Sequence, residues 1–293
     1  MNAIELQKLT KYYGKSRGIV ELDLPVEQGE FFGFIGPNGA GKSTTIRALL
    51  GLIRADSGTA SVMGFDAARE RYDILRNVGY LPSEISFYNG MRAKDVIRLS
   101  ASLRGGHFDE EATTLCQRLD LDVNKRVEEL SLGNRKKVAI VCALQHRPPL
   151  YILDEPTSGL DPLIQREVFA LLKERNADGA TVFLSSHVLS EVQKHCRRAG
   201  IIREGRLVAC DTVEALSDAA AKRVTVKGEA DVASLRGVRD LTVKEDGVTF
   251  LYSGEWRDLL AVLAKGDVRD LTACEPDLDE IFLHYYANGG ETV

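Results

Sequence analysis

The segment Gly36-Pro37-Asn38-Gly39-Ala40-Gly41-Lys42-Ser43-Thr44 decides the fold of this chain. It follows the apolar run Phe31–Ile35 and precedes a stretch with helical spacing, Thr45–Leu50. A strand, a glycine-rich turn and a helix in this order make up the phosphate-binding loop pattern G-x-x-x-x-G-K-[ST]. The sequence therefore predicts that this segment, the phosphate loop, binds the phosphates of ATP or GTP.

Each position of the phosphate loop has a chemical reason. Its glycines adopt conformations closed to residues with a Cβ atom, so successive N–H groups can curl around phosphate oxygens. The positive end of the following helix faces the same anion. Lys42 can then reach the β- and γ-phosphates, and the Ser43 hydroxyl can bind Mg²⁺. An ordinary glycine-rich turn is the alternative, but the flanking strand and helix favour nucleotide binding.

The composition is that of a globular protein, with 293 residues, 44% of them hydrophobic and 28% charged. A net charge of −5 gives no electrostatic footprint of nucleic-acid binding, so no nucleic acid is expected as a partner. No apolar run approaches the roughly 18–20 residues of a membrane span, and the N-terminus does not resemble a signal peptide. Five cysteines without C-x-x-C spacing predict reduced thiols in the cytosol.

The hydrophobic pattern predicts an α/β fold for the first part of the chain. Strands are expected at Ile4–Leu9, Ile19–Val26, Glu30–Ile35, Thr59–Met63, Val78–Leu81, Leu150–Leu153, Thr181–Ser185 and Gly200–Ile202. Helices are expected after the phosphate loop, through much of 91–147, and at Leu163–Asn176 and Val188–Cys196. Unbroken apolar runs are typical of buried parallel strands, which supports this fold class.

The composition changes after about residue 215. The expected order there is strand Arg223–Lys227, helix Asp231–Leu235, strands Asp240–Lys244 and Val248–Tyr252, helix Trp256–Ala264, strand Val268–Ala273 and helix Leu278–Tyr286. The order β-α-β-β-α-β predicts a small α+β domain of the ferredoxin-like kind. We therefore expect one domain at 1–215, with a helical subdomain at about 85–145, and an accessory domain at 216–293.

Two carboxylates follow the apolar strand at Leu150–Leu153. In a protein with a phosphate loop, Asp154 stands where a Mg²⁺ ligand facing Ser43 belongs. Glu155 can polarise a water molecule for attack on the γ-phosphate. A solvated acidic pair in a turn is the alternative, which the phosphate loop disfavours.

Further motifs appear in a fixed order: Lys11–Gly14, the phosphate loop, Leu130–Asn134, Ile152–Pro156, Ser158–Asp161 and Ser186-His187. In this order they resemble the ATP-binding subunits of ABC transporters over residues 1 to about 215. The resemblance implies a P-loop ATPase of the ABC type that uses ATP and Mg²⁺. It implies that Tyr13 supports the adenine ring, that Glu155, His187 and Lys42 are catalytic, and that Leu130–Asn134 is the family signature.

The signature also has a physical reading, because Ser131 can cap a helix whose free N–H groups form a second anion site. The family solution is a head-to-tail dimer, in which Ser131 and Gly133 of one subunit cover the nucleotide held by Lys42 of the other. The resemblance thus implies a homodimer, or pairing with a similar ATPase subunit. It also implies a separately encoded transmembrane permease and a cytoplasmic position on the inner face of the membrane.

Two motifs depart from the family pattern. Ser83 stands where the family normally carries a glutamine, with Glu84 after it, and Leu132 and Asn134 replace a glycine and a glutamine of the signature. These variants, and the closing segment Glu275–Phe282, resemble the ABC-2 type exporters. A soluble ABC ATPase that acts on ribosomes or DNA is the alternative function. Such proteins usually carry two ATPase modules, long coiled coils or basic arms, which are not seen here.

Overall fold

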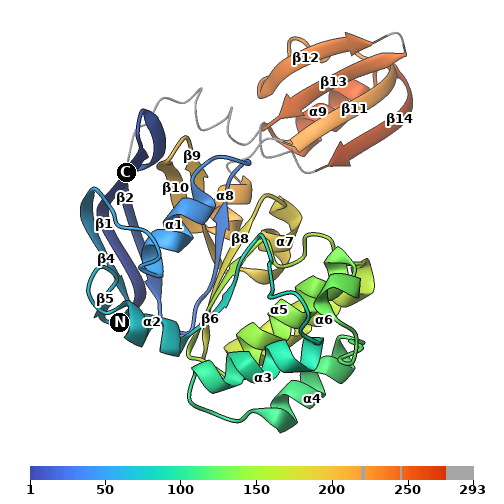
Figure 1. Cartoon of the computed structure of the whole chain (residues 1–293). Helices are drawn as coiled ribbons and strands as arrows, with labels where there is room; N and C mark the ends of the chain where they lie inside the picture. The colour runs from blue at the N-terminus through green and yellow to red at the C-terminus, as the bar shows by residue number, and fades with distance from the viewer. Residues whose placement is uncertain (219–221, 245, 275–293) are drawn as a thin grey trace. The chain divides into compact units, whose positions relative to one another are not determined.

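The computed structural model describes residues 1–218, 222–244 and 246–274. The chain divides into two compact units, the first covering Met1–Asp211 and the second beginning at Thr212 (Figure 1). The expected helix at Leu278–Tyr286 and the closing segment Glu275–Phe282 lie outside the described residues. Within the described residues, no helix has the length and apolar character that crossing a membrane requires.

The centre of the first unit is a sheet with the strand order β10-β9-β3-β8-β7-β6. Its strands are β3 (Phe31–Ile35), β6 (Val78–Leu81), β7 (Leu150–Asp154), β8 (Thr181–Ser186), β9 (Arg198–Arg203) and β10 (Arg206–Thr212). The pairs β6–β7, β7–β8, β8–β3 and β3–β9 are parallel. Every residue of β3, β7 and β8 is buried, which explains the apolar runs that these strands contain and confirms the α/β prediction.

A second sheet, with the order β2-β1-β4-β5, is built from the N-terminal strands of the first unit (Figure 1). Its strands are β1 (Asn2–Tyr13), β2 (Ser16–Glu27), β4 (Ser57–Val62) and β5 (Phe65–Asp66), and their pairs are antiparallel. One apolar core joins both sheets to helix α1 (Lys42–Leu49), through residues such as Leu24, Ile46 and Phe183. This shared core fixes the phosphate loop between the two sheets.

Helices surround the parallel sheet and form a separate helical region (Figure 1). They are α2 (Arg71–Asn77), α3 (Ala93–Leu103), α4 (Asp109–Arg118), α5 (Leu132–Leu144), α6 (Pro162–Ala177) and α7 (Leu189–His195), with a 3₁₀ turn at Val127–Glu129. Helix α5 contacts α3, α4 and β6, so it connects the helical region to the sheet. The helical prediction for much of 91–147 is confirmed.

The second unit starts with helix α8 (Val213–Asp218) and continues as an antiparallel sheet with helix α9 (Trp256–Leu263). The strands are β11 (Lys222–Glu229), β12 (Val238–Lys244), β13 (Gly247–Tyr252) and β14 (Asp267–Cys274), in the order β12-β13-β11-β14. Numbered by sequence this order is 2-3-1-4, and each connected pair is antiparallel, as two split β-α-β units require. Leu259 and Leu263 of α9 complete its core.

The expected helix at Asp231–Leu235 is wrong. The chain forms turns there, with the Leu235 N–H donating to the Val232 carbonyl over 3.1 Å. A helix of five residues does not offset the free-energy cost of its nucleation unless packing stabilises it. The turn already buries Val232, which is 1% exposed, so a helix would bury little more apolar surface. The unit therefore keeps the strand order of the ferredoxin-like plan but replaces its first helix with a turn.

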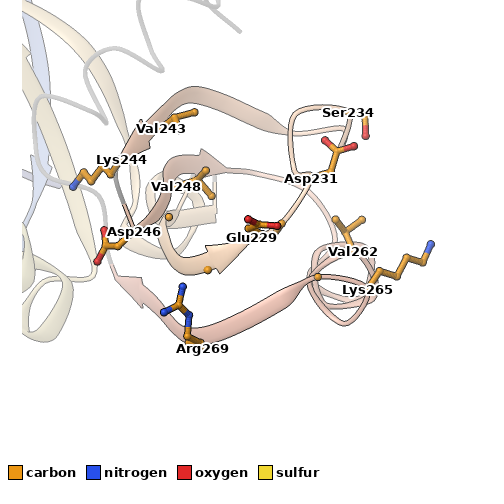
Figure 2. A pocket seen from close by; sticks show the side chains of 14 residues that line it. Glu229, Asp231, Ser234, Val243, Lys244, Asp246, Val248, Val262, Lys265 and Arg269 are labelled. Carbon is orange, nitrogen blue, oxygen red and sulfur yellow. The ribbon is translucent and has the colours of Figure 1, made fainter.

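A surface hollow of about 760 Å³ opens in the second unit, beside the turn that replaces the helix. Figure 2 shows Glu229, Asp231, Asp246 and Arg269 around it, with Val248 among its lining residues. The charged residues carry both signs and are exposed, which is typical of a solvated surface.

Candidate nucleotide-binding site

The phosphate loop connects the end of β3 to the start of α1 and leaves no room for side chains at two of its glycines. A Cβ atom on Gly36 would lie 2.4 Å from the carbonyl oxygen of Ile202. Gly41, the residue before α1, has a φ of +114°, and a Cβ atom on it would lie 2.8 Å from the carbonyl oxygen of Gly18. Only glycine fits both positions, so the backbone can approach a phosphate group closely.

Lys42, the first residue of α1, is held inside this loop and is only 5% exposed. Its Nζ donates to the carbonyl oxygens of Gly36, over 2.6 Å, and Pro37, over 3.2 Å. Nζ also lies 3.6 Å from Oε1 of Glu155. Burial lowers the pKa of Lys42, while the charges of Glu155 and Asp154 act in the opposite direction. The ammonium group is thus fixed between the loop and the carboxylates at the end of β7.

Asp154 joins three elements at the carboxyl edge of the sheet. It is 2% exposed, and its two carboxylate oxygens accept from the hydroxyls of Ser43, over 2.6 Å, and Ser185, over 2.5 Å. A hydroxyl and a carboxylate are the oxygen ligands that Mg²⁺ prefers, usually together with substrate phosphates. No cluster of three or more His, Cys, Asp or Glu side chains suited to a metal is found in the described residues. The Ser43–Asp154 pair therefore fits a cation that shares its ligands with a nucleotide.

Glu155 has an unusual backbone. Its φ is +50°, in the left-handed region that non-glycine residues rarely occupy, and its N–H donates to the Ser185 carbonyl over 3.1 Å. Its side chain is 20% exposed, and Oε1 lies 3.0 Å from Nδ1 of His187, which follows β8. Strained backbone held by its surroundings is characteristic of functional positions. The arrangement aims Glu155 and His187 at each other on the loop side of the sheet.

These parts meet around a hollow of about 350 Å³. The residues that line it are Tyr13, Arg17, Gly18, Asn38, Gly39, Gly41, Lys42, Ser43, Thr44, Ser83, Glu84 and Glu155. The structure therefore brings Tyr13, most of the phosphate loop and Glu155 together. Sequence reasoning missed Arg17, which forms an ion pair with Glu204 over 2.9 Å. The register of the β1–β2 hairpin, which pairs Tyr12 with Arg17, brings Arg17 beside Tyr13, and no short sequence motif signals this.

Ser131 and Gly133 do not line this hollow. Ser131 caps α5, and its hydroxyl accepts from the N–H of Asn134 over 3.3 Å, which confirms the predicted cap. A Cβ atom on Gly133 would lie 2.9 Å from the carbonyl oxygen of Gly159, so the signature lies against Ser158–Asp161. The first turn of α5 carries no acidic residue that would repel an anion. The chain thus has two separate places suited to anions.

Asp161 has a local role that sequence reasoning missed. It caps α6, accepting from the backbone N–H groups of Leu163, over 3.1 Å, and Ile164, over 3.0 Å. An aspartate directly before a proline is a helix-start signal, and Pro162 is the first residue of α6. The cap fixes the end of the segment that touches the signature.

The parallel sheet, with its phosphate loop and the carboxylates facing it, places the chain among the P-loop nucleoside triphosphatases. The ABC transporter family model matches residues 19–158. The chain is 33% identical to the bacitracin transport ATP-binding protein BcrA of Bacillus licheniformis, with 98% of each chain covered. It is 30% identical to the linearmycin resistance ATP-binding protein LnrL of Bacillus subtilis, with 96% of this chain and 97% of the relative covered. The chain belongs to the ABC transporter ATP-binding proteins.

Solved structures agree with this assignment. An ATP-binding subunit of an ABC transporter is 31% identical, with a TM-score of 0.69 over 73% of this chain and 91% of that chain. A dimeric ATP-binding cassette, MJ0796, bound to ADP and Pi, shows the same fold at 23% identity, with a TM-score of 0.66 over 72% of this chain and 98% of that chain. The predicted ABC ATPase fold, the ATPase activity and the transporter function are confirmed, and the alternative of a ribosome- or DNA-directed ATPase is not favoured.

Proposed function

We propose that this subunit drives export of a substrate by closing and opening a head-to-tail dimer around ATP. One observation carries the proposal: the hollow at Lys42 and the capped helix start at Ser131 are both suited to phosphate, yet Ser131 does not line the hollow. A second subunit, turned head to tail, supplies its own Ser131 and Gly133 to cover the γ-phosphate. The second subunit is a copy of this chain or a similar ATPase subunit.

Within each site, the loop N–H groups and Lys42 bind the phosphates, and Tyr13 supports the adenine ring. Ser43 and Asp154 hold Mg²⁺, which when bound neutralises charge on the β- and γ-phosphates. Glu155 accepts a proton from the attacking water, and His187 keeps the Glu155 carboxylate in place and reaches the γ-phosphate. When a phosphate group binds, the ammonium group of Lys42 leaves the loop carbonyls and Glu155 and contacts the phosphate instead.

We infer a separately encoded transmembrane permease as the partner, and a place on the cytoplasmic face of the membrane. Support comes from relatives of nearly the same length whose names describe ATP-binding components of bacitracin transport and linearmycin resistance. Resistance to an antibiotic is most simply achieved by moving it out of the cell, which favours an exporter. The transported substrate need not touch this subunit, so its residues do not identify it.

Co-purification tests the partner. Tagged chain expressed in its own host should bring down a protein with several membrane spans from detergent-solubilised membranes, and the pair should show ATPase activity together. The variant Lys42→Ala, which keeps the surface outside the loop, should retain this partner. Sedimentation with ribosomes in place of a membrane protein would overturn the proposal.

A further inference from the structure

Arg17 lines the nucleotide hollow but belongs to none of the sequence motifs of the family. It lies near the start of β2, where the hairpin register pairs it with Tyr12. Its side chain is 51% exposed, so a ligand can reach the guanidinium group. Among the described residues that line the hollow, the other lysine or arginine is Lys42, which is only 5% exposed. The hollow therefore has one enclosed cation and one accessible cation.

The backbone beside Arg17 lies between Tyr13 and the phosphate loop. A Cβ atom on Gly18 would lie 3.1 Å from the Tyr13 ring and 3.0 Å from Cγ2 of Thr44. The Gly18 carbonyl oxygen lies against Gly41, where an added Cβ atom would be 2.8 Å from it. Arg17 therefore enters the hollow between the end proposed for adenine and the end that holds the terminal phosphates. A nucleotide that spans both ends has its α-phosphate in this middle part.

Arg17 has a partner that a phosphate group can replace. Its Nη1 lies 2.9 Å from Oε2 of Glu204, in the turn between β9 and β10. The next residue, Gly205, holds this turn against the phosphate loop, because its N–H donates to the Ala40 carbonyl over 2.8 Å. Glu204 is 50% exposed and does not line the hollow. Because water screens an ion pair between half-exposed side chains, a phosphate group beside Arg17 can compete with the Glu204 carboxylate.

We propose that Arg17 is a further nucleotide-binding residue, whose guanidinium group leaves Glu204 and bonds to the α-phosphate of the bound nucleotide. This inference rests on the nucleotide site of the proposed function. A guanidinium group donates two parallel hydrogen bonds to one phosphate group, and its charge strengthens both. ATP and ADP both contain the α-phosphate. Arg17 therefore stabilises the bound nucleotide before and after hydrolysis, and Glu204 keeps the guanidinium group beside the hollow when nucleotide is absent.

Arg17→Gln removes the charge and keeps a polar side chain. Isothermal titration calorimetry with Mg²⁺ should show the Kd for ATP and the Kd for ADP rising by the same factor, about five- to tenfold, because both nucleotides lose one charged contact. Arg17→Lys keeps the charge and should recover part of the affinity. Equal losses for ATP and ADP locate the contact at a group that the two nucleotides share.

Glu204→Gln distinguishes a ligand contact from a structural tie. It removes the carboxylate that competes for Arg17, so the Kd for ADP should fall about twofold, a small change because the ion pair is exposed. If Arg17 served only to tie the β1–β2 hairpin to the turn at Glu204, the loss of either partner would weaken nucleotide binding to the same degree.

Arg206→Gln is the matched control. Arg206 of β10 forms a similar ion pair with Glu21 of β2 over 3.3 Å, is 59% exposed, and does not line the hollow. Its loss should leave the Kd for both nucleotides at the wild-type value. Wild-type affinity in Arg17→Gln, or equal weakening in Arg17→Gln and Glu204→Gln, would overturn the role of Arg17. ADP titration needs no second subunit, so it tests Arg17 separately from the ATP-driven dimer of the proposed function.

Discussion

Glu155→Gln removes one negative charge from the nucleotide hollow and leaves the shape of the side chain almost unchanged. In the structure the Glu155 carboxylate lies 3.6 Å from Nζ of Lys42 and 3.0 Å from Nδ1 of His187. A glutamine can still accept a hydrogen bond from His187, but it cannot take a proton from water. The variant should therefore bind ATP and fail to hydrolyse it.

The structure sets the size of both effects. At 3.6 Å, an ion pair in surroundings of effective dielectric constant near 20 gains about 4–5 kcal/mol before solvent and geometry reduce it. Lys42 must give up this attraction when it turns to a phosphate, so its loss in the variant favours nucleotide. Water at the 20%-exposed Glu155 offsets most of this attraction. We therefore expect the variant to bind ATP about 1 kcal/mol more tightly, which lowers the Kd about fivefold. Loss of the general base should lower kcat by at least about a hundredfold.

Light scattering after gel filtration measures the outcome. The 32.2 kDa chain should double its mass when the variant receives ATP and Mg²⁺, and should return to a monomer when ATP is removed. Glu191→Gln is the matched control, because Glu191 bonds to Thr157 and Ser186 outside the hollow, and it should retain turnover. A mass that does not respond to nucleotide, or wild-type turnover in Glu155→Gln, would refute the reasoning.

Four further predictions concern single positions. Lys42→Ala should weaken ATP binding by at least about a hundredfold, because a charge-assisted contact to phosphate is lost; fluorescence titration with a nucleotide analogue measures this. Ser83→Gln should raise basal ATPase activity, since a longer amide reaches the nucleotide from the lining position of Ser83, and unchanged turnover would contradict it. Asp161→Ala should lower the free energy of unfolding by about 0.5–2 kcal/mol in urea, through loss of the α6 cap. Burial, aided by the charge of Arg104, lowers the pKa of His146 to about 4, so the unfolded chain takes up the proton at a higher pH than the folded chain. The free energy of unfolding should therefore fall as the pH drops from about 6.5 towards 4. Urea denaturation at a series of pH values measures this fall, and His146→Gln should make it smaller.

The part of the site that depends on local sequence could be predicted before the structure. The phosphate loop needs glycines, a lysine and a serine at fixed spacing between a strand and a helix, so its pattern is nearly complete in nine residues. Asp154 ends a strand whose five residues are all buried, Glu155 follows it, and the carboxyl end of such a strand faces the loop. The structure places Ser43 against Asp154 as this reasoning requires.

The part of the fold and of the site that depends on tertiary packing could not be predicted from the sequence. Lys136 and Lys137 are adjacent in sequence, and helical periodicity alone cannot say which of them reaches the Asp120 carbonyl, to which Lys137 donates over 3.3 Å. The segment Asp231–Leu235 has a helical pattern, but in the fold it forms a turn, because a single turn of helix is decided by its surroundings. Arg17 enters the hollow through a hairpin register that no short motif encodes.

The two residues of the signature that differ from the family pattern, Leu132 and Asn134, differ in whether their side chains bear on the anion site at the start of α5. Ser131 still caps α5, and its hydroxyl accepts from the backbone N–H of Asn134. The cap therefore does not depend on which side chain stands at position 134. Leu132 is 60% exposed, and its side chain lies at contact distance from Gly159, where an added Cβ would be 3.3 Å from Cδ2. A glycine at position 132 could make no such contact. Leucine therefore leaves the N–H groups of the helix start in place and ties the signature to Ser158–Asp161, so that in a closing dimer the two segments would meet the partner's nucleotide as one surface.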